Sequence, residues 1–254
     1  MSFPEYFEKS FYVKGTDTSR SHTVFPSCML GDMQETSEGG VLQYGMDTDS
    51  LLKNDFCWII LKMSVRMKRL PKWRETFKVR TWNAGVSGLF FRRSYYICDA
   101  DDNVIGSADS LWIIADVNSH RPVRPKNIFA IYDKPDMEIS ISAPQNDFEL
   151  DFTIPSVSFP SDEVIGDSPL MSKYADYSEI DSNNHVNNTR YVSWALDALH
   201  KYGVNVDGIK DFDITYHAEV KESEKVDLYV YESEGFYYVV GLKQDSKVFI
   251  FRAS

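Results

Sequence analysis

Residues 181–199 carry the sequence DSNNHVNNTRYVSWALDAL, a polar cluster that continues into a predicted amphipathic helix. Apolar side chains recur three and four residues apart, at Tyr191, Trp194, Ala195, Ala198 and Leu199. This spacing places them in one stripe on a helix that we expect to span residues 188–202 and to end at Gly203. A helix with such a stripe must lie against an apolar surface, and a sheet that curls around the helix would provide it.

The polar cluster before this helix has a carboxylate, an amide and an imidazole at alternate positions, Asp181, Asn183 and His185. Residues two apart in an extended segment project to the same side, so these three could face one cavity. Backbone N–H groups at the helix start, with Asn187 and Asn188 as candidate caps, could stabilise negative charge on a carbonyl oxygen. The combination indicates acyl transfer. Taken singly, each residue has an alternative role in a turn, in a cap or at the surface.

Strand-like runs rich in aromatic and branched residues form two series along the chain. The first comprises residues 58–67, 75–82, 89–98 and 104–115, and the second comprises residues 212–220, 225–231, 236–242 and 248–252. A candidate helix precedes each series, at residues 30–39 and at residues 188–202. This repeated order predicts the α+β class, with two related units in which an antiparallel sheet wraps around a central helix. One large α+β domain is the alternative.

The segment between the two series, residues 120–162, contains six prolines, which prevent long regular elements. We interpret it as a connection between two domains. The expected boundaries are a first domain at residues 1–135, a linker at residues 136–160 and a second domain at residues 161–254.

The composition is that of an ordinary globular protein, with a net charge of −11. This acidic balance argues against general binding of nucleic acid, which needs an excess of Lys and Arg. Three cysteines, Cys28, Cys57 and Cys98, form no CxxC pair and indicate a reducing compartment. The N-terminal residues lack the features of a signal peptide, and the apolar stretch at residues 56–65 is interrupted by Lys62 and is too short to span a bilayer. We expect a cytoplasmic protein outside the membrane.

The pattern D-x-N-x-H-V-N-N-x-x-Y-x-x-W at the start of the predicted helix resembles the signature of plant and bacterial acyl-acyl carrier protein (acyl-ACP) thioesterases. Upstream, RMKRLPKWRETFKVRTW, LFFRRSYYI and DNVIGSADSLWIIADVNSHRPVRP are similar to the N-terminal unit of that family. Downstream, DITYHAEV matches the strand that carries an acidic residue next to a cysteine in the family. The resemblance implies two tandem hotdog domains and hydrolysis of fatty acyl-ACP to free fatty acid and holo-ACP, with the acyl carrier protein as partner. It leaves a homodimer open.

Carried over residue by residue, the family pattern implies four catalytic residues, Asp181, Asn183, His185 and Glu219. Val220 stands where the family has its cysteine, so a cysteine nucleophile is excluded at that position. Either Asp181 attacks the thioester carbonyl or it activates a water molecule, while His185 and Glu219 manage the protons. We expect no cofactor and no metal, because the sequence has no zinc-ligand spacing, no GxSxG and no phosphate-binding glycine loop.

Other residues have weaker assignments. His217, two residues before Glu219, either lines the site or is structural. The methionines at positions 29, 33, 63 and 67 are candidates for an acyl tunnel, with plain core packing as the alternative. Basic residues that could dock an acidic carrier, or could simply face solvent, are Arg66, Lys68, Arg69, Lys72, Arg74, Lys78, Arg80, Arg92, Arg93, Arg121, Arg124 and Lys126.

We expect one active site per chain. The first unit reads VKGTDTSRSHTVFPSCMLGDMQ before its helix, without D-x-N-x-H and without the following Asn pair. An ungapped match of KMSVRMKRL to the later strand places Lys68 near the position of Glu219. The alternatives to the acyl-ACP thioesterase are an acyl-CoA thioesterase, a non-catalytic acyl-binding protein and a dehydratase of the hotdog fold.

Overall fold

The structure is a computed structural model that describes residues 6–132 and 168–254. Its strands form one 10-stranded sheet in the order β1-β3-β4-β5-β2-β7-β10-β9-β8-β6, and every neighbouring pair is antiparallel. The strands are β1 (Phe7–Tyr12), β2 (Phe56–Met67), β3 (Thr76–Ser87), β4 (Phe90–Asp99), β5 (Val104–Asp116), β6 (Met171–Tyr174), β7 (Phe212–Tyr216), β8 (Lys225–Ser233), β9 (Phe236–Lys243) and β10 (Ser246–Ala253). The helices are α1 (Pro26–Leu42), α2 (Thr48–Leu52), α3 (Pro125–Ile131) and α5 (Asn188–Tyr202), with 3-10 turns at Gly15–Asp17, Tyr177–Glu179 and Val206–Gly208. The α+β class is therefore confirmed, while the expected linker at residues 136–160 lies outside the described residues.

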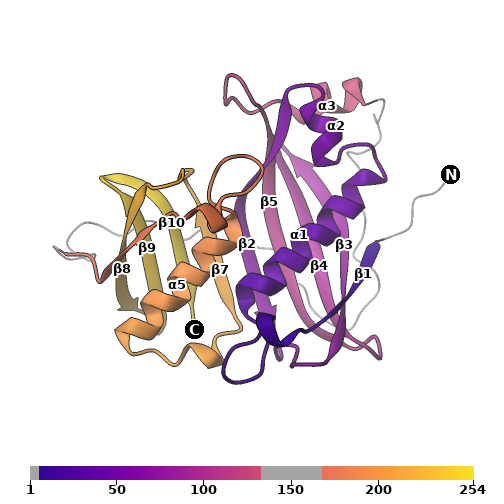
Figure 1. Cartoon of the computed structure of the whole chain (residues 1–254). Coiled ribbons are helices and arrows are strands. Elements are labelled where there is room, and N and C mark those ends of the chain that lie inside the picture. Colours follow the sequence, from indigo (N-terminus) through magenta and orange to yellow (C-terminus); the bar gives the residue numbers. More distant parts are fainter. Residues whose placement is uncertain (1–5, 133–167) are drawn as a thin grey trace.

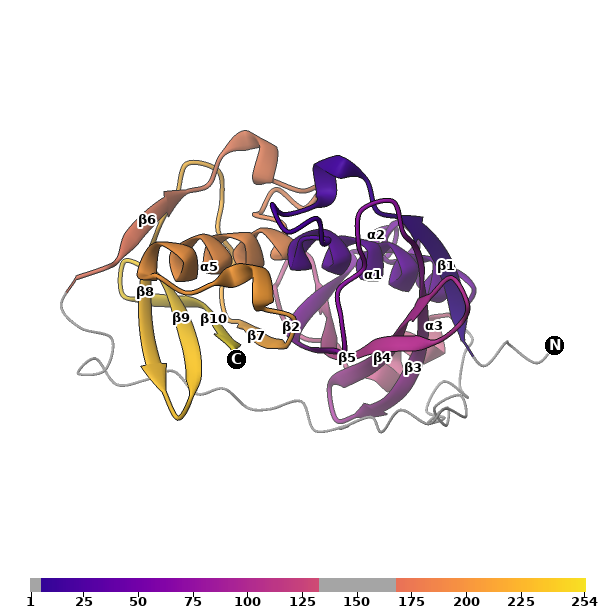
Figure 2. The ribbon, with the colours of Figure 1, turned by 90° about the horizontal axis from the view of Figure 1, so that it is seen from below.

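The sheet has the same strand order on both sides of its centre. Outward from the central β2–β7 pair, β5, β4, β3 and β1 follow on one side, and β10, β9, β8 and β6 follow on the other. Helices α1 and α5 lie side by side on one face of this sheet (Figure 1), and the view from below shows both helices on the same side of it, with the strands curving beneath them (Figure 2).

The two long helices bury their sheet-facing sides for different sequence reasons. Helix α5 has the apolar stripe predicted from its periodicity, begins with an Asn187 side-chain cap and ends at Gly203 with φ of 104°. Helix α1 begins at Pro26, earlier than expected, and contains glycines that allow close packing. A Cβ atom at Gly39 would lie 2.5 Å from the ring of Phe7 on β1. Close approach at its glycines, together with buried apolar residues such as Met29, Leu30 and Met33, therefore positions α1.

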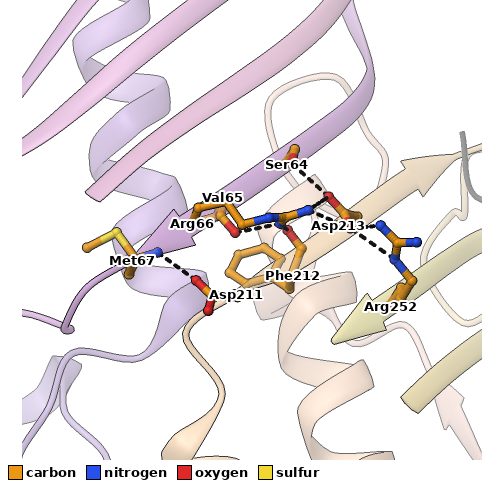
Figure 3. Close-up of polar contacts among 8 residues, drawn as sticks. All are labelled: Ser64, Val65, Arg66, Met67, Asp211, Phe212, Asp213 and Arg252. Carbon is orange, nitrogen blue, oxygen red and sulfur yellow. Dashed lines mark hydrogen bonds and ion pairs between the residues drawn. The ribbon is translucent and has the colours of Figure 1, made fainter. Parts of the chain in front are cut away.

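A buried polar network joins the two halves at the β2–β7 pair (Figure 3). The Asp213 carboxylate accepts hydrogen bonds from Ser64 Oγ at 2.6 Å, from Arg66 Nη2 at 2.8 and 3.0 Å, and from Arg252 Nε at 3.0 Å. At the end of the pair, Met67 N donates to Asp211 Oδ1 at 2.7 Å. These bonds fix the register of β2 against β7, and both strands lead into the cavity described below.

Strand β7 is shorter than the predicted run at residues 212–220. The backbone N–H groups of His217 and Ala218 both donate to the carbonyl of Val248, at 2.7 and 3.2 Å, so the chain leaves the ladder there. The segment then turns toward α5, where Val186 N donates to the carbonyl of Val220 at 2.8 Å. Glu219 consequently lies on a connecting segment beside the helix start, and not on a strand. Among the described helices, none combines the length and the hydropathy needed to cross a membrane.

Candidate active site

The loop before α5 has a defined hydrogen-bonded shape. A bridge pairs Ile180 with Val186, Asp181 N donates to the carbonyl of His185 at 2.9 Å, and Asn184 closes the loop with φ of 62°. The Asp181 carboxylate accepts a bond from the backbone N–H of Asn183 at 2.8 Å. The sequence forms this loop because Asp and Asn stabilise turns through their own side chains and tolerate positive φ.

Two further contacts fix the loop against α5. Trp194 Nε1, on the first turns of the helix, donates to Glu179 Oε1 at 2.8 Å. Asn187 Oδ1 caps the helix by accepting from the backbone N–H of Thr189 at 3.0 Å and from its hydroxyl at 2.7 Å. The polar cluster is thus held at the N-terminal end of the helix, as its sequence predicts.

The structure brings His185 and Glu219 together although they are far apart in the sequence. His185 Nε2 lies 3.2 Å from Glu219 Oε2, and the two side chains are 21% and 49% exposed. Asp181 and Asn183 line the same cavity as this pair. All four predicted catalytic residues therefore line one cavity, and in the His185–Glu219 pair a carboxylate can hold an imidazole in place.

The site opens into a cavity of about 1410 Å³ that reaches from the loop before α5 into the first half of the protein. Its walls in the first half come from α1, from the first part of β2, and from residues of β3, β4 and β5 that include Asn83, Phe91 and Trp112. The hydroxyl of Tyr216 donates to the carbonyl of Asn188 at 3.2 Å and so connects the end of β7 to the helix start at the cavity wall. Such a volume is above the range of about 300–1,000 Å³ that is usual for small-molecule pockets.

Cys57 is a cavity residue that sequence reasoning did not connect with the site. It lies on β2, lines the cavity and is close enough to Glu219 to be affected by its charge. Burial raises the pKa of the Cys57 thiol, and the charges of Glu219 and Asp116 raise it further, so the thiol stays protonated and is a poor nucleophile. No pattern in the sequence marks this residue, because only the β2–β7 pairing brings it near Glu219. His217 also lines the cavity, and burial lowers its pKa, with smaller contributions from Lys247 and Lys62.

The four methionines considered for an acyl tunnel are core residues. Met29 and Met33 are 0% exposed, Met63 is 1% exposed and Met67 is 3% exposed. All four belong to the main hydrophobic core, and none lines the cavity. The tunnel interpretation is therefore wrong for these residues, because they are buried in the main hydrophobic core.

Some of the basic residues considered for carrier docking form ion pairs within the protein. Arg66 bonds Asp213, Arg69 bonds Glu75 at 2.7 Å, Lys78 bonds Asp102 at 2.9 Å, and Arg80 pairs with Glu8. They extend from the last part of β2 into β3, whereas the cavity uses the first part of β2. Arg93 is 8% exposed and packs beneath α1. Arg92 lies 3.4 Å from Asp109, so five of the twelve basic residues form ion pairs within the described part of the chain, and docking at the others remains a prediction.

The first half contains the same loop without the reactive side chains. A bridge pairs Thr18 with Val24, and Ser19 N donates to the carbonyl of Thr23 at 2.9 Å, as Asp181 N does to His185. Val24 N donates to the carbonyl of Pro71, as Val186 N does to Val220. The positions of Asp181, Asn183, His185 and Glu219 are therefore occupied by Ser19, Ser21, Thr23 and Leu70.

This equivalence corrects the ungapped match that placed Lys68 at the position of Glu219, since that match is two residues out of register. Leu70 can neither accept a proton nor orient an imidazole, so the expectation of one site per chain stays in place. Within the described residues, no group of three His, Cys, Asp or Glu side chains is arranged to hold a metal ion.

Two family models match the chain, the acyl-ACP thioesterase N-terminal domain over residues 4–132 and the acyl-ACP thioesterase C-terminal domain over residues 167–247. A palmitoyl-acyl carrier protein thioesterase of Cuphea hookeriana is 25% identical over 202 residues, which is 76% of this chain and 46% of that protein. An oleoyl-acyl carrier protein thioesterase of Arabidopsis thaliana is 22% identical over 233 residues, which is 87% of this chain and 61% of that protein. The matches thus span less than two thirds of these relatives.

Two solved structures share the fold over nearly the whole chain. An acyl-ACP thioesterase from Bacteroides thetaiotaomicron superposes with a TM-score of 0.79 at 21% identity, covering 98% of this chain and 97% of the other. The 12:0-ACP thioesterase from Umbellularia californica superposes with a TM-score of 0.80 at 18% identity, covering 100% and 98%. At these identities the comparison establishes a hotdog-like α+β fold.

Proposed function

Because the chain belongs to the acyl-ACP thioesterase family, we propose that it hydrolyses fatty acyl-ACP to free fatty acid and holo-ACP. The observation that carries the proposal is the pair formed by His185 and Glu219, 3.2 Å apart, at the mouth of a cavity with room for an acyl chain. Asp181 and Asn183 complete the site from the same loop.

The four residues would divide the work of hydrolysis. Either water, activated by Asp181 as general base, or the Asp181 carboxylate itself adds to the thioester carbonyl; in the second case water hydrolyses the mixed anhydride after the thiolate has left. The C–S bond breaks, and the thiolate of the carrier's arm takes up a proton to become the free thiol. Glu219 orients His185, which handles the protons, while Asn183 and the N–H groups at the start of α5 support the charge on the carbonyl oxygen.

Asp181 has one oxygen available for this role. Its Oδ1 accepts from the backbone of Asn183, and the hydrogen bonds within residues 6–132 and 168–254 leave Oδ2 without a partner. A thiolate is a good leaving group, so a positioned carboxylate and modest carbonyl polarisation suffice for the reaction.

We also propose the finer architecture of two tandem hotdog units, with domains at residues 1–135 and 161–254. The mirrored strand order around β2–β7 supports it, as do the matching loops before α1 and α5. In this arrangement the second unit supplies the catalytic loop, and the first unit supplies most of the cavity wall.

The decisive test compares acyl-ACP and acyl-CoA thioesters of matched chain length with one purified enzyme preparation. We expect a higher kcat/KM on acyl-ACP, and we expect His185→Ala to remove the activity on both. An equal or higher kcat/KM on acyl-CoA would identify a coenzyme A thioesterase instead. Absence of turnover on both thioesters would favour a non-catalytic acyl-binding protein.

A further inference from the structure

The deep part of the cavity contains two polar side chains on neighbouring strands, Asn83 on β3 and Arg93 on β4. They are direct cross-strand partners, so both side chains lie on the same face of the sheet. Both line the cavity, and each is only 8% exposed. Tyr95 is two residues after Arg93 on β4, so the two side chains lie on the same face of the sheet. The Tyr95 hydroxyl is 2.8 Å from Ser37 Oγ on α1, so this is the face beneath the helix.

Helix α1 leaves space for the guanidinium group. A Cβ atom at Gly40 would lie 3.1 Å from Arg93 Nη1 and 3.4 Å from Thr81 Cγ2. Glycine destabilises the interior of a helix, so its presence here fits a site where the backbone must pass close to another group. Arg93 is thus held between α1 and the sheet, at the wall of the cavity.

Most of the hydrogen-bonding capacity of this pair is unused. A guanidinium has five N–H donors, and Arg93 uses Nη1 to bond Thr81 Oγ1 at 3.2 Å. Across the described part of the chain, its side chain makes no other hydrogen bond or ion pair, and the Asn83 amide makes no hydrogen bond. Burial lowers the pKa of Arg93, which reflects how little solvent reaches it.

An acidic side chain lines the same cavity without neutralising Arg93. Glu38 on α1 accepts from the backbone N–H of Thr48 at 2.7 Å and from its hydroxyl at 3.0 Å. Its charge is near enough to act on Arg93, but the two groups form no ion pair with each other. The cavity therefore presents donors from one wall and a carboxylate from another.

An unsubstituted hydrocarbon chain that filled this space would displace water from buried donors and would offer them no acceptor, which is unfavourable. An oxygen on the chain would accept from Arg93 and Asn83, and a hydroxyl could in addition donate to Glu38. Resting on the proposed thioesterase function, we propose that Asn83 and Arg93 form an oxygen-binding subsite, and that the preferred substrates are acyl thioesters with a hydroxyl or keto oxygen along the chain.

The subsite lies some distance from the catalytic loop. Gln34 of α1 bonds Asn188 at the start of α5, and Gly40, six residues later on the same helix, lies over Arg93. A helix rises about 1.5 Å per residue, so the separation along α1 is about 9 Å. The oxygen should therefore be inside the acyl chain and not adjacent to the thioester.

The test measures kcat/KM on pairs of acyl-ACP substrates of equal length, one plain and one with a mid-chain hydroxyl or keto group. The wild-type enzyme should prefer the oxygenated member by about tenfold or more, the size of effect expected for a hydrogen bond to a charged group. Arg93→Met should abolish or reverse this preference, and Asn83→Leu should reduce it. Phe91→Leu, a change in the same wall without polar atoms, should keep it.

Affinities of the matched free acids, measured by calorimetry, report on the cavity independently of turnover. Equal or weaker use of the oxygenated substrates by the wild type, together with equal or weaker binding of the oxygenated acids, would overturn the subsite while leaving the thioesterase intact. If no thioester were hydrolysed, the proposed function would fail, and the calorimetric preference alone would decide the subsite. Should Arg93→Met not fold, Asn83→Leu and the wild-type comparison decide it.

Discussion

Replacing Asp213 with alanine should destabilise the protein by about 3 kcal/mol, because this carboxylate holds together the two central strands. Its side chain is 5% exposed and accepts bonds from Ser64 on β2 and from Arg66 and Arg252. Removing one member of a buried ion pair costs about 3–5 kcal/mol, since the charges left behind lose their partner. The lower end applies here, because Arg66 is 41% exposed and can turn to solvent, while Arg252 at 18% cannot do so as easily.

Urea unfolding followed by tryptophan fluorescence measures this change in the free energy of unfolding. The dependence of that free energy on urea concentration should be the same in both proteins, which shows that they unfold to a similar state. The matched control is Asp197→Ala, which also removes an aspartate bonded to a cation, Lys173, at 2.8 Å. Asp197 is 57% exposed, so its loss should cost less than about 1 kcal/mol. If Asp213→Ala cost no more than Asp197→Ala, the central network would not hold the halves together as argued.

Other changes should separate catalysis from structure. His185→Ala and Glu219→Gln should each lower kcat by about 100-fold or more with the melting temperature nearly unchanged, because each removes part of the proton-handling pair; a near wild-type kcat would remove that pair from the mechanism. Cys57→Ser should keep most of the activity and should also remove any inhibition by bulky thiol reagents, since this thiol lines the cavity without acting as nucleophile; loss of turnover in Cys57→Ser would contradict this. His22→Ala, in the equivalent loop of the first half, should leave kcat intact, and its loss would argue for a second site. Burial and the charge of Asp17 raise the pKa of Asp32 from 3.8 to about 6, so the folded state loses stability as the pH rises through this window. Asp32→Asn should thus match the wild type below about pH 4 and exceed its stability at pH 7 by about 1 kcal/mol, a value reduced by solvent screening, and equal urea midpoints at pH 7 would refute it.

Local features of the sequence were sufficient for several elements. The periodicity of Tyr191, Trp194 and Leu199 predicts α5 with its observed bounds, because a helix and its caps depend on residues within a few positions. The polar loop before it could also be predicted, since Asp181 and Asn184 form the turn through their own backbone and side chains. The strands of both series were predicted to within a few residues, except that β1 and β6 at the sheet edges were not anticipated.

The sequence by itself therefore determined the α+β class, the repeated order of helix and sheet, and the loop that carries Asp181, Asn183 and His185. Tertiary structure alone decided which distant groups meet there. The 3.2 Å approach of Glu219 to His185 depends on β7 ending early against Val248, and the position of Cys57 depends on the pairing of β2 with β7. The burial of Arg93 depends on how closely α1 passes at Gly40. Such contacts depend on strand register and on the separation between layers, which are set by the packing of the whole sheet against its helices and leave no local pattern in the chain.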